Sequence, residues 1–193
     1  HLWYFVKRLL PGITIQPPGY TSVRSLASIL KSAGTFMLNV VTWEQIVAHS
    51  DVVLAFGGMA LKNSMVAGGS ISKHVERGAM ERARARGCRF VLVSPLRADL
   101  PDEAGLEWVP SVPGTDTALM LALVHTLVLN RLHDRDFLDR YTVGWPIFER
   151  YLLGETDGQP KSADWAAGIT GVAAKTIIDL ALSLYGRRAL IVV

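Results

Sequence analysis

The chain has 193 residues, of which half are hydrophobic, with a mean hydropathy of +0.27, a net charge of +3 and a single cysteine, Cys88. One cysteine excludes an internal disulfide and a multi-thiolate metal site, and the mild charge, with no aromatic residues among the clustered bases, disfavours a nucleic-acid surface. The most apolar helical stretch, Thr117–Asn130, is shorter than the roughly 20 residues that a membrane span needs.

The sequence is expected to be a piece of a larger protein, because so apolar a composition suits a chain with apolar interfaces. It opens at His1 and stops inside the run Ala189–Val193, which is interpreted as a strand cut short. We expect residues 1–40 to form an irregular or helical lead-in segment. Residues 41–193 are expected to form an α/β domain, truncated at its C-terminus, in which helices flank a Rossmann-like parallel sheet and a helical hairpin is inserted.

The first part of the chain gives few signals. Residues 1–20 show no clear pattern, whereas Ser22–Ala33 has the apolar spacing of a helix that Thr21 or Ser22 can cap. Trp43–His49 is predicted to be a short helix that leads into the first strand.

The clearest structural signal in the sequence is the stretch Asp51–Gly58. Its five apolar residues, Val52–Phe56, end at two glycines. A short apolar run of this kind is typical of a strand buried on both faces of a parallel sheet. Glycines at its carboxyl end leave the backbone open to another molecule, and that end is where open α/β sheets bind ligands.

A βαβ unit follows. Residues 59–72 are predicted to form a loop that carries Lys62 and Asn63, Lys73–Arg86 a helix ended by Gly87, and Cys88–Val93 a second buried strand. Such a unit implies a parallel pair with a right-handed crossover.

The rest of the chain alternates in the same way. We expect a short third strand at Leu106–Val109, followed by a buried helix for which Thr115 is a natural N-cap and Asp116 a favourable first-turn charge. The buried helix is predicted at Thr117–Arg131. Further helices are predicted at His133–Tyr141 and Pro146–Leu153, which make the hairpin, at Ser162–Gly168, and from Thr170 or Gly171 to Tyr185, and Arg188–Val193 begins a final strand.

Three loops are predicted to leave the same edge of the sheet: Gly57-Gly58, Ser94-Pro95 and Pro110–Asp116. A nucleotide would lie there. The Gly-x-Gly-x-x-Gly pattern of nicotinamide-binding folds is missing, which disfavours that cofactor. Ordinary strand-to-loop turns explain the glycines about as well.

Asp116 has two interpretations. It can favour the helix N-terminus, or its carboxylate can accept two hydrogen bonds from the edge of a guanine base. Lys62 and Arg97 can meet phosphates or simply face solvent, and a structural role is favoured for His74 and His125. The sequence shows no catalytic triad, carboxylate pair or metal-ligand cluster.

Several motifs follow one another from Val41 onward: Thr42–Ile46, His49–Asp51, Phe56–Asn63, Ser94–Arg97, Gly114–Leu121, His125–Leu127, Tyr151–Lys161 and Ala163–Ala167. In this order they resemble the dimethyl sulfoxide reductase family of molybdopterin oxidoreductases, and most of all its trimethylamine-N-oxide and biotin sulfoxide reductase branch. A match over so much of the chain is far more specific than any single motif.

The resemblance implies a molybdenum enzyme that transfers an oxygen atom from an N-oxide or S-oxide and holds its metal between two molybdopterin guanine dinucleotides. The segment is similar to the family domain that binds one of these dinucleotides, and the other domains of the parent enzyme would be its partners. The implied cofactor-binding residues are those of the three loops: Phe56, Gly57, Gly58, Lys62, Asn63, Ser94, Pro95, Arg97, Gly114, Thr115 and Asp116.

The sequence departs from the family pattern in two places. The resemblance places a metal-ligating serine near Ser22, but the residues around it differ, and a helix N-cap is the alternative role for Ser22 or Thr21. Ala98-Asp99 replaces a Glu-Thr pair that is frequent in the family, which weakens a ribose contact there.

Two other functions stay open. One is a non-catalytic nucleotide-binding α/β module, and the other is a purely structural copy whose loops bind nothing. The oxide substrate, the electron donor and the compartment, bacterial periplasm or cytoplasm, are not specified by these residues.

Overall fold

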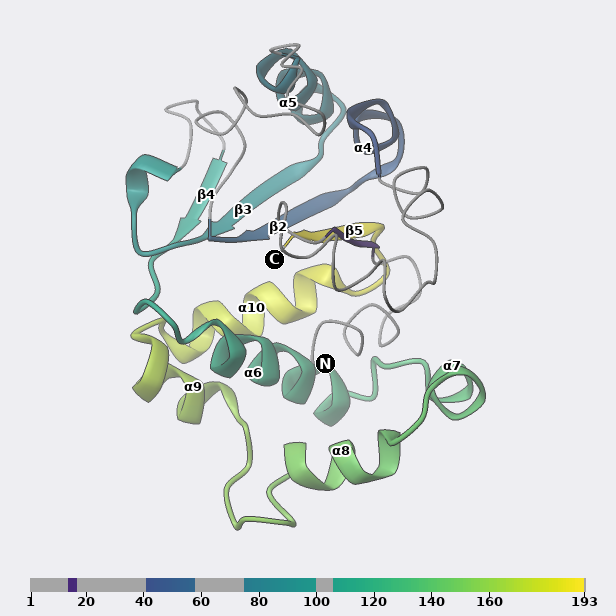
Figure 1. Ribbon diagram of the computed structural model, residues 1–193, viewed down its shortest axis with the longest axis vertical. Coiled ribbons are helices and arrows are strands. Elements are labelled where there is room, and N and C mark those ends of the chain that lie inside the picture. Colours follow the sequence, from purple (N-terminus) through teal and green to yellow (C-terminus); the bar gives the residue numbers. More distant parts are fainter. Residues whose placement is uncertain (1–13, 17–40, 58–74, 100–105, 193) are drawn as a thin grey trace, which may run out of the picture.

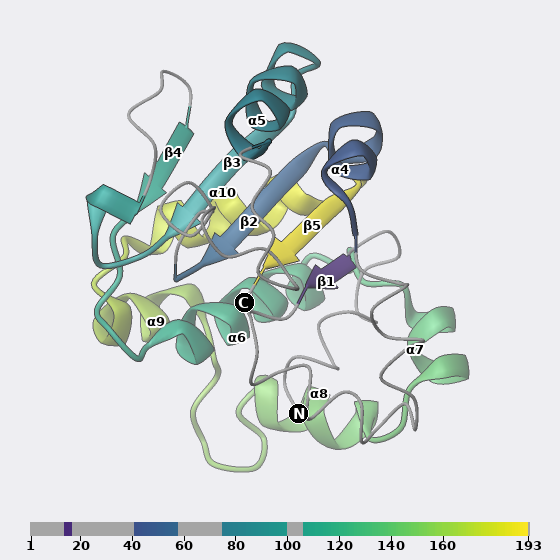
Figure 2. The same cartoon turned by 45° about the horizontal axis from the view of Figure 1, so that its top comes forward.

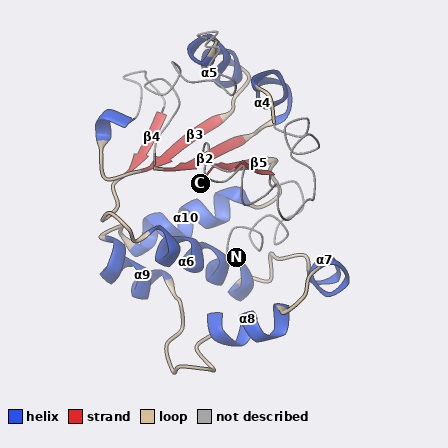
Figure 3. Cartoon of the chain, viewed as in Figure 1, coloured by secondary structure: helices blue, strands red, loops and turns tan. Residues whose placement is uncertain are grey.

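The computed structural model of the chain describes residues 14–16, 41–57, 75–99 and 106–192. Over these residues, one parallel sheet lies between helices on both of its faces (Figures 1 and 3). The predicted α/β fold class is therefore confirmed.

The sheet has five strands in the order β1-β5-β2-β3-β4, and every neighbouring pair is parallel (Figure 2). The strands are β1 (Thr14–Gln16), β2 (Val52–Phe56), β3 (Arg89–Val93), β4 (Leu106–Val109) and β5 (Ala189–Val192). Four of them follow the predicted strands closely. The sequence pattern did not predict β1, which is only three residues long.

The helices are α4 (Trp43–His49), α5 (Glu76–Ala85), the 3-10 turn η2 (Arg97–Asp99), α6 (Asp116–Leu129), α7 (Arg135–Tyr141), α8 (Trp145–Leu152), α9 (Ala163–Thr170) and α10 (Ala174–Leu184). Most predicted helix boundaries differ from the observed ones by one to four residues. Helix α6 begins at Asp116, one residue early. Helix α10 begins at Ala174 instead of Thr170 or Gly171, because Gly171, at φ 72°, ends α9 in a left-handed conformation.

The continuous apolar run of β2 reflects burial on both of its faces. Val52, Leu54 and Phe56 join the core beneath α6, α9 and α10, whereas Val53 and Ala55 pack toward α4 and α5. Successive side chains of a strand point to opposite faces, so only a strand covered on both sides needs five apolar residues in a row.

Helix α6 separates two cores, which explains why it is apolar nearly all round. One side of it faces the sheet, and the other side packs on the hairpin formed by α7 and α8. The hairpin core consists of Leu121, Val124 and Val128 from α6 with Leu138, Trp145 and Leu152 from the hairpin.

The order of the strands creates a switch point beside β2. From β2 the chain crosses over α5 to β3 and then reaches β4 on one side, whereas α10 leads back to β5 on the other side of β2. The two crossovers cover opposite faces of the sheet (Figure 1). In open α/β sheets, a crevice at the carboxyl ends of such diverging strands is the usual ligand site.

Candidate functional site

The carboxyl ends of β2, β3 and β4 lie side by side and converge at the left of Figure 1. Phe56 pairs with Val93, which pairs in turn with Val109. Backbone hydrogen bonds continue one residue further: Gly57 N donates to Val93 O at 2.9 Å, and Ser94 N donates to Val109 O at 3.2 Å. The loops that follow these strands therefore begin at one edge, which we call the rim.

Gly57 stands at the switch point of the rim. It is exposed and has a φ of 93°. A methyl group added to it would meet no atom of the described residues within 4 Å, so its backbone conformation, and not crowding among them, favours glycine. Phe56, just before it, is buried in the core with 8% exposure and supports the strand end from below.

The second rim loop is a tight turn. Ser94 is 1% exposed, and its Oγ accepts a hydrogen bond from Leu96 N at 3.2 Å. Pro95 and Arg97 are exposed, and Arg97 begins η2. Among the described residues, no acid forms an ion pair with Arg97. Its guanidinium is thus available to an anion.

The third rim loop, which follows β4, is hydrogen-bonded to the end of α9. Val112 N donates to Thr170 O at 2.9 Å, which ties the loop to the end of that helix. Thr115 occupies the predicted N-cap position, but its hydroxyl donates to Val112 O at 2.6 Å and does not cap α6. Gly114 has a φ of 77°, a conformation that glycine adopts without strain.

Asp116 is the first residue of α6 and is half-buried. Burial raises the pKa of its carboxyl group, and within the described part of the chain no hydrogen bond or ion pair reaches that group. Close by in the sequence, the Oγ of buried Ser111 also has no hydrogen-bond partner among the described residues. A desolvated carboxylate and a buried hydroxyl that lack partners are typical of a binding site.

The structure thus brings eight predicted cofactor-binding residues to the rim. Phe56 and Gly57 lie at the switch point, and the other six come from the loops after β3 and β4: Ser94, Pro95, Arg97, Gly114, Thr115 and Asp116. Gly58, Lys62, Asn63 and the candidate metal ligand Ser22 lie outside the described residues. Sequence reasoning did not single out Trp108 or Thr170, whose hydrogen bonds to the rim join residues distant in the sequence. It also did not single out Ser111, whose burial only the structure reveals.

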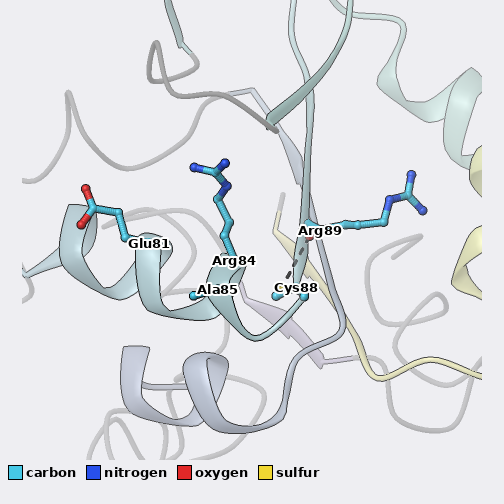
Figure 4. Close-up of a pocket in the computed structure, with 6 residues that line it drawn as sticks. Glu81, Arg84, Ala85, Cys88 and Arg89 are labelled. Atoms are coloured by element: carbon cyan, nitrogen blue, oxygen red, sulfur yellow. Dashed lines mark hydrogen bonds between the residues drawn. The ribbon is translucent and has the colours of Figure 1, made fainter.

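A hollow of about 460 Å³ lies at the opposite edge of the sheet, between the end of α5 and the start of β3 (Figure 4). In Figure 4 the side chain of Arg89 extends to the opposite side from those of Glu81 and Arg84, and Arg89 is already paired with Glu107 at 2.8 Å. Cys88 is buried there, and burial raises the pKa of its thiol to about 11. These side chains do not converge on a ligand.

Two further features of the described residues concern metal ligation and membrane-spanning helices. Within the described ranges, no three His, Cys, Asp or Glu side chains come together as metal ligands. No single helix in the same ranges is long and apolar enough to cross a bilayer, although α9 and α10, bent by 119°, meet those criteria when counted as one.

Comparisons with known proteins point to one group of enzymes. The chain is 42% identical over 152 residues to biotin sulfoxide reductase from Cereibacter sphaeroides, a match that covers 79% of this chain and 20% of that protein. It is 39% identical over 151 residues to trimethylamine-N-oxide reductase from Haemophilus influenzae, covering 78% and 18%. Dimethyl sulfoxide/trimethylamine N-oxide reductase from Rhodobacter capsulatus is 35% identical over 149 residues, covering 77% and 18%.

The chain therefore spans about a fifth of the length of the curated relatives that it matches. Among solved structures, acetylene hydratase from Pelobacter acetylenicus superimposes with a TM-score of 0.54 at 24% identity, covering 75% of this chain and 18% of that one. This likeness shows the fold. No protein-family model matches the sequence.

Proposed function

Because the chain carries a segment of the dimethyl sulfoxide reductase family, we propose that it is the dinucleotide-binding domain of a molybdenum-dependent N-oxide or S-oxide reductase. The relatives confirm the resemblance drawn from the motifs. The observation that supports the assignment of this segment is the rim beside the switch point of the sheet. Gly57, Arg97 and Asp116 lie there, in the segments that follow the neighbouring strands β2, β3 and β4.

The proposed cofactor is molybdenum bis(molybdopterin guanine dinucleotide), of which this domain holds one dinucleotide. The residues of the rim fit such a group. The backbone at Gly57 is open, the N-terminus of α6 and the cation of Arg97 suit a pyrophosphate, and the unpaired carboxylate of Asp116 suits the donor edge of guanine. When bound, the molybdenum supplies the oxygen-atom transfer.

The residues of the chain bind and orient the cofactor. Backbone N–H groups and the positive end of the α6 dipole stabilise phosphate charge, and a half-buried position strengthens hydrogen bonds to Asp116 by excluding water. The partners of the domain are the other domains of the parent protein, a small N-oxide or S-oxide, and an electron donor whose chemistry these residues do not specify.

The test uses the full-length parent protein, purified with its native cofactor. Molybdenum is measured by mass spectrometry, and guanine nucleotide is released with acid and measured by chromatography. We expect molybdenum together with guanine nucleotide in the parent. Asp116→Ala is expected to weaken retention of guanine nucleotide by about ten- to a hundredfold, as the loss of hydrogen bonds to a charged group implies.

Asp164→Ala is the matched control, since Asp164 is the exposed first-turn carboxylate of α9. Both substitutions remove a favourable charge from a helix N-terminus, but only Asp116 belongs to the rim. If both variants retain as much guanine nucleotide as the parent, Asp116 only stabilises its helix and the guanine role is wrong. A parent that binds guanine nucleotide without molybdenum would instead indicate a non-catalytic nucleotide-binding module.

A further inference from the structure

Trp108 connects two strands of the rim through its side chain. It lies on β4, the edge strand, and is half-buried against the cluster under α4 and α5. Its indole Nε1–H donates a hydrogen bond to the main-chain oxygen of Ser94, with 2.8 Å between the two atoms. Ser94 is the first residue after β3, so the indole holds the start of the neighbouring loop.

Other hydrogen bonds between described residues also hold the turn after β3. The N–H of Ser94 donates to Val109 O at 3.2 Å, and its Oγ accepts from Leu96 N at 3.2 Å. The carbonyl of Ser94, which accepts from the indole, is a further point of attachment. Together these bonds fix the direction in which the chain leaves the sheet, and hence where Pro95 and Arg97 lie.

We propose that Trp108 is a positioning residue for the nucleotide, acting through the turn Ser94–Arg97. The inference rests on the proposed function, because it assumes that this turn contacts the dinucleotide. The backbone ladder between β3 and β4 ends with the bond from Ser94 N to Val109 O, so it does not fix the chain beyond Ser94. A loop that binds a ligand through its backbone must be held in place before the ligand arrives, and the indole N–H supplies that restraint.

Neighbouring residues of β4 lie on opposite faces of the sheet. Neighbouring Val109 points into the core beneath the sheet, whereas Trp108 lies on the other face, as alternation along a strand requires. The ring therefore packs on the α4–α5 side while its N–H reaches the strand end. A phenylalanine keeps the apolar packing and removes the donor.

The test compares the full-length parent with two variants at this position. Trp108→Phe removes the N–H and shrinks the ring, whereas Trp108→benzothienylalanine keeps the ring size and replaces only the N–H by sulfur. Bound guanine nucleotide is followed during dialysis, and thermal unfolding is recorded in parallel. We expect both variants to lose guanine nucleotide about two- to tenfold faster than the parent, the effect of one neutral hydrogen bond.

Trp145→Phe is the control, because Trp145 is buried in the α7–α8 hairpin core, away from the rim. It is expected to lower the unfolding temperature and to leave the rate of nucleotide loss unchanged. Normal retention in Trp108→benzothienylalanine would overturn the proposal, since the ring and not its N–H would then matter. Equally fast loss in Trp145→Phe would also overturn it. A parent with no guanine nucleotide would refute the proposed function itself.

Discussion

Gly154 and Gly158 provide a matched pair of glycines in the loop that connects α8 and α9. Both have left-handed backbones, at φ 82° and 72°, and Gly158 N donates to Gly154 O at 2.8 Å. An added methyl group at Gly158 would meet nothing within 4 Å. At Gly154 it would collide with the backbone of Pro160 and lie 2.6 Å from the carbonyl carbon of Gln159.

Replacing each glycine by alanine should therefore lower the free energy of unfolding by different amounts. Gly158→Ala is expected to lower the free energy of unfolding by about 1–2 kcal/mol, the strain of a left-handed alanine. In Gly154→Ala the methyl group also collides with backbone atoms, which cannot rotate away as a side chain can. We therefore expect this variant to lower the free energy of unfolding by about 3–4 kcal/mol in total.

Urea unfolding followed by tryptophan fluorescence measures both values on the same chain. The loop is held by Lys161, whose N–H donates to Leu152 O at 2.9 Å and whose Nζ donates to Asp157 at 2.5 Å. A shift of the segment that carries Pro160 would disturb these bonds. Equal losses for the two variants, or a smaller loss for Gly154→Ala, would refute the reasoning.

Three further predictions concern buried or paired groups. At about pH 8 the thiol of Cys88, whose pKa burial raises to about 11, should react with iodoacetamide about a hundredfold more slowly in the folded chain than in urea; equal rates would contradict its burial. The backbone N–H of Arg188 donates to the carboxylate of Asp51 and lowers its pKa. Asp51→Asn should therefore lower the free energy of unfolding by about 1 kcal/mol at neutral pH in urea titrations. This difference should vanish as the pH falls below the usual aspartate range, where the carboxylate becomes protonated, and a difference that stays constant with pH would contradict the linkage. Thr170→Val removes a buried hydroxyl that accepts from Val172 N at 3.1 Å and should cost about 1–3 kcal/mol in the same assay; an unchanged midpoint would contradict it.

The strands of the central sheet could be predicted because burial on both faces requires uninterrupted apolar runs such as Val52–Phe56. The grouping of the rim loops followed from the same pattern, since parallel strands place their carboxyl ends at one edge. Short elements were harder. Three residues of β1 form a strand because β5 offers a partner, and this pairing is invisible in the local sequence.

The details of the site depended on hydrogen bonds between residues far apart in the sequence. Thr115 has the residue type of an N-cap, but its hydroxyl turns to Val112 O. Local spacing does not reveal that the indole of Trp108 reaches Ser94, or that Thr170 accepts from Val112 N. The roles of Gly58, Lys62, Asn63 and Ser22 remain predictions from the resemblance.

The position of the guanine base in the full-length parent tests the central claim most directly. A structure of the parent with its native cofactor should place the N1–H and N2 amino edge of one guanine within hydrogen-bond distance of the Asp116 carboxylate, with the pyrophosphate of the same dinucleotide at the rim. Both guanines bound away from Gly57, Arg97 and Asp116 would contradict the claim, however similar the chain is to its relatives.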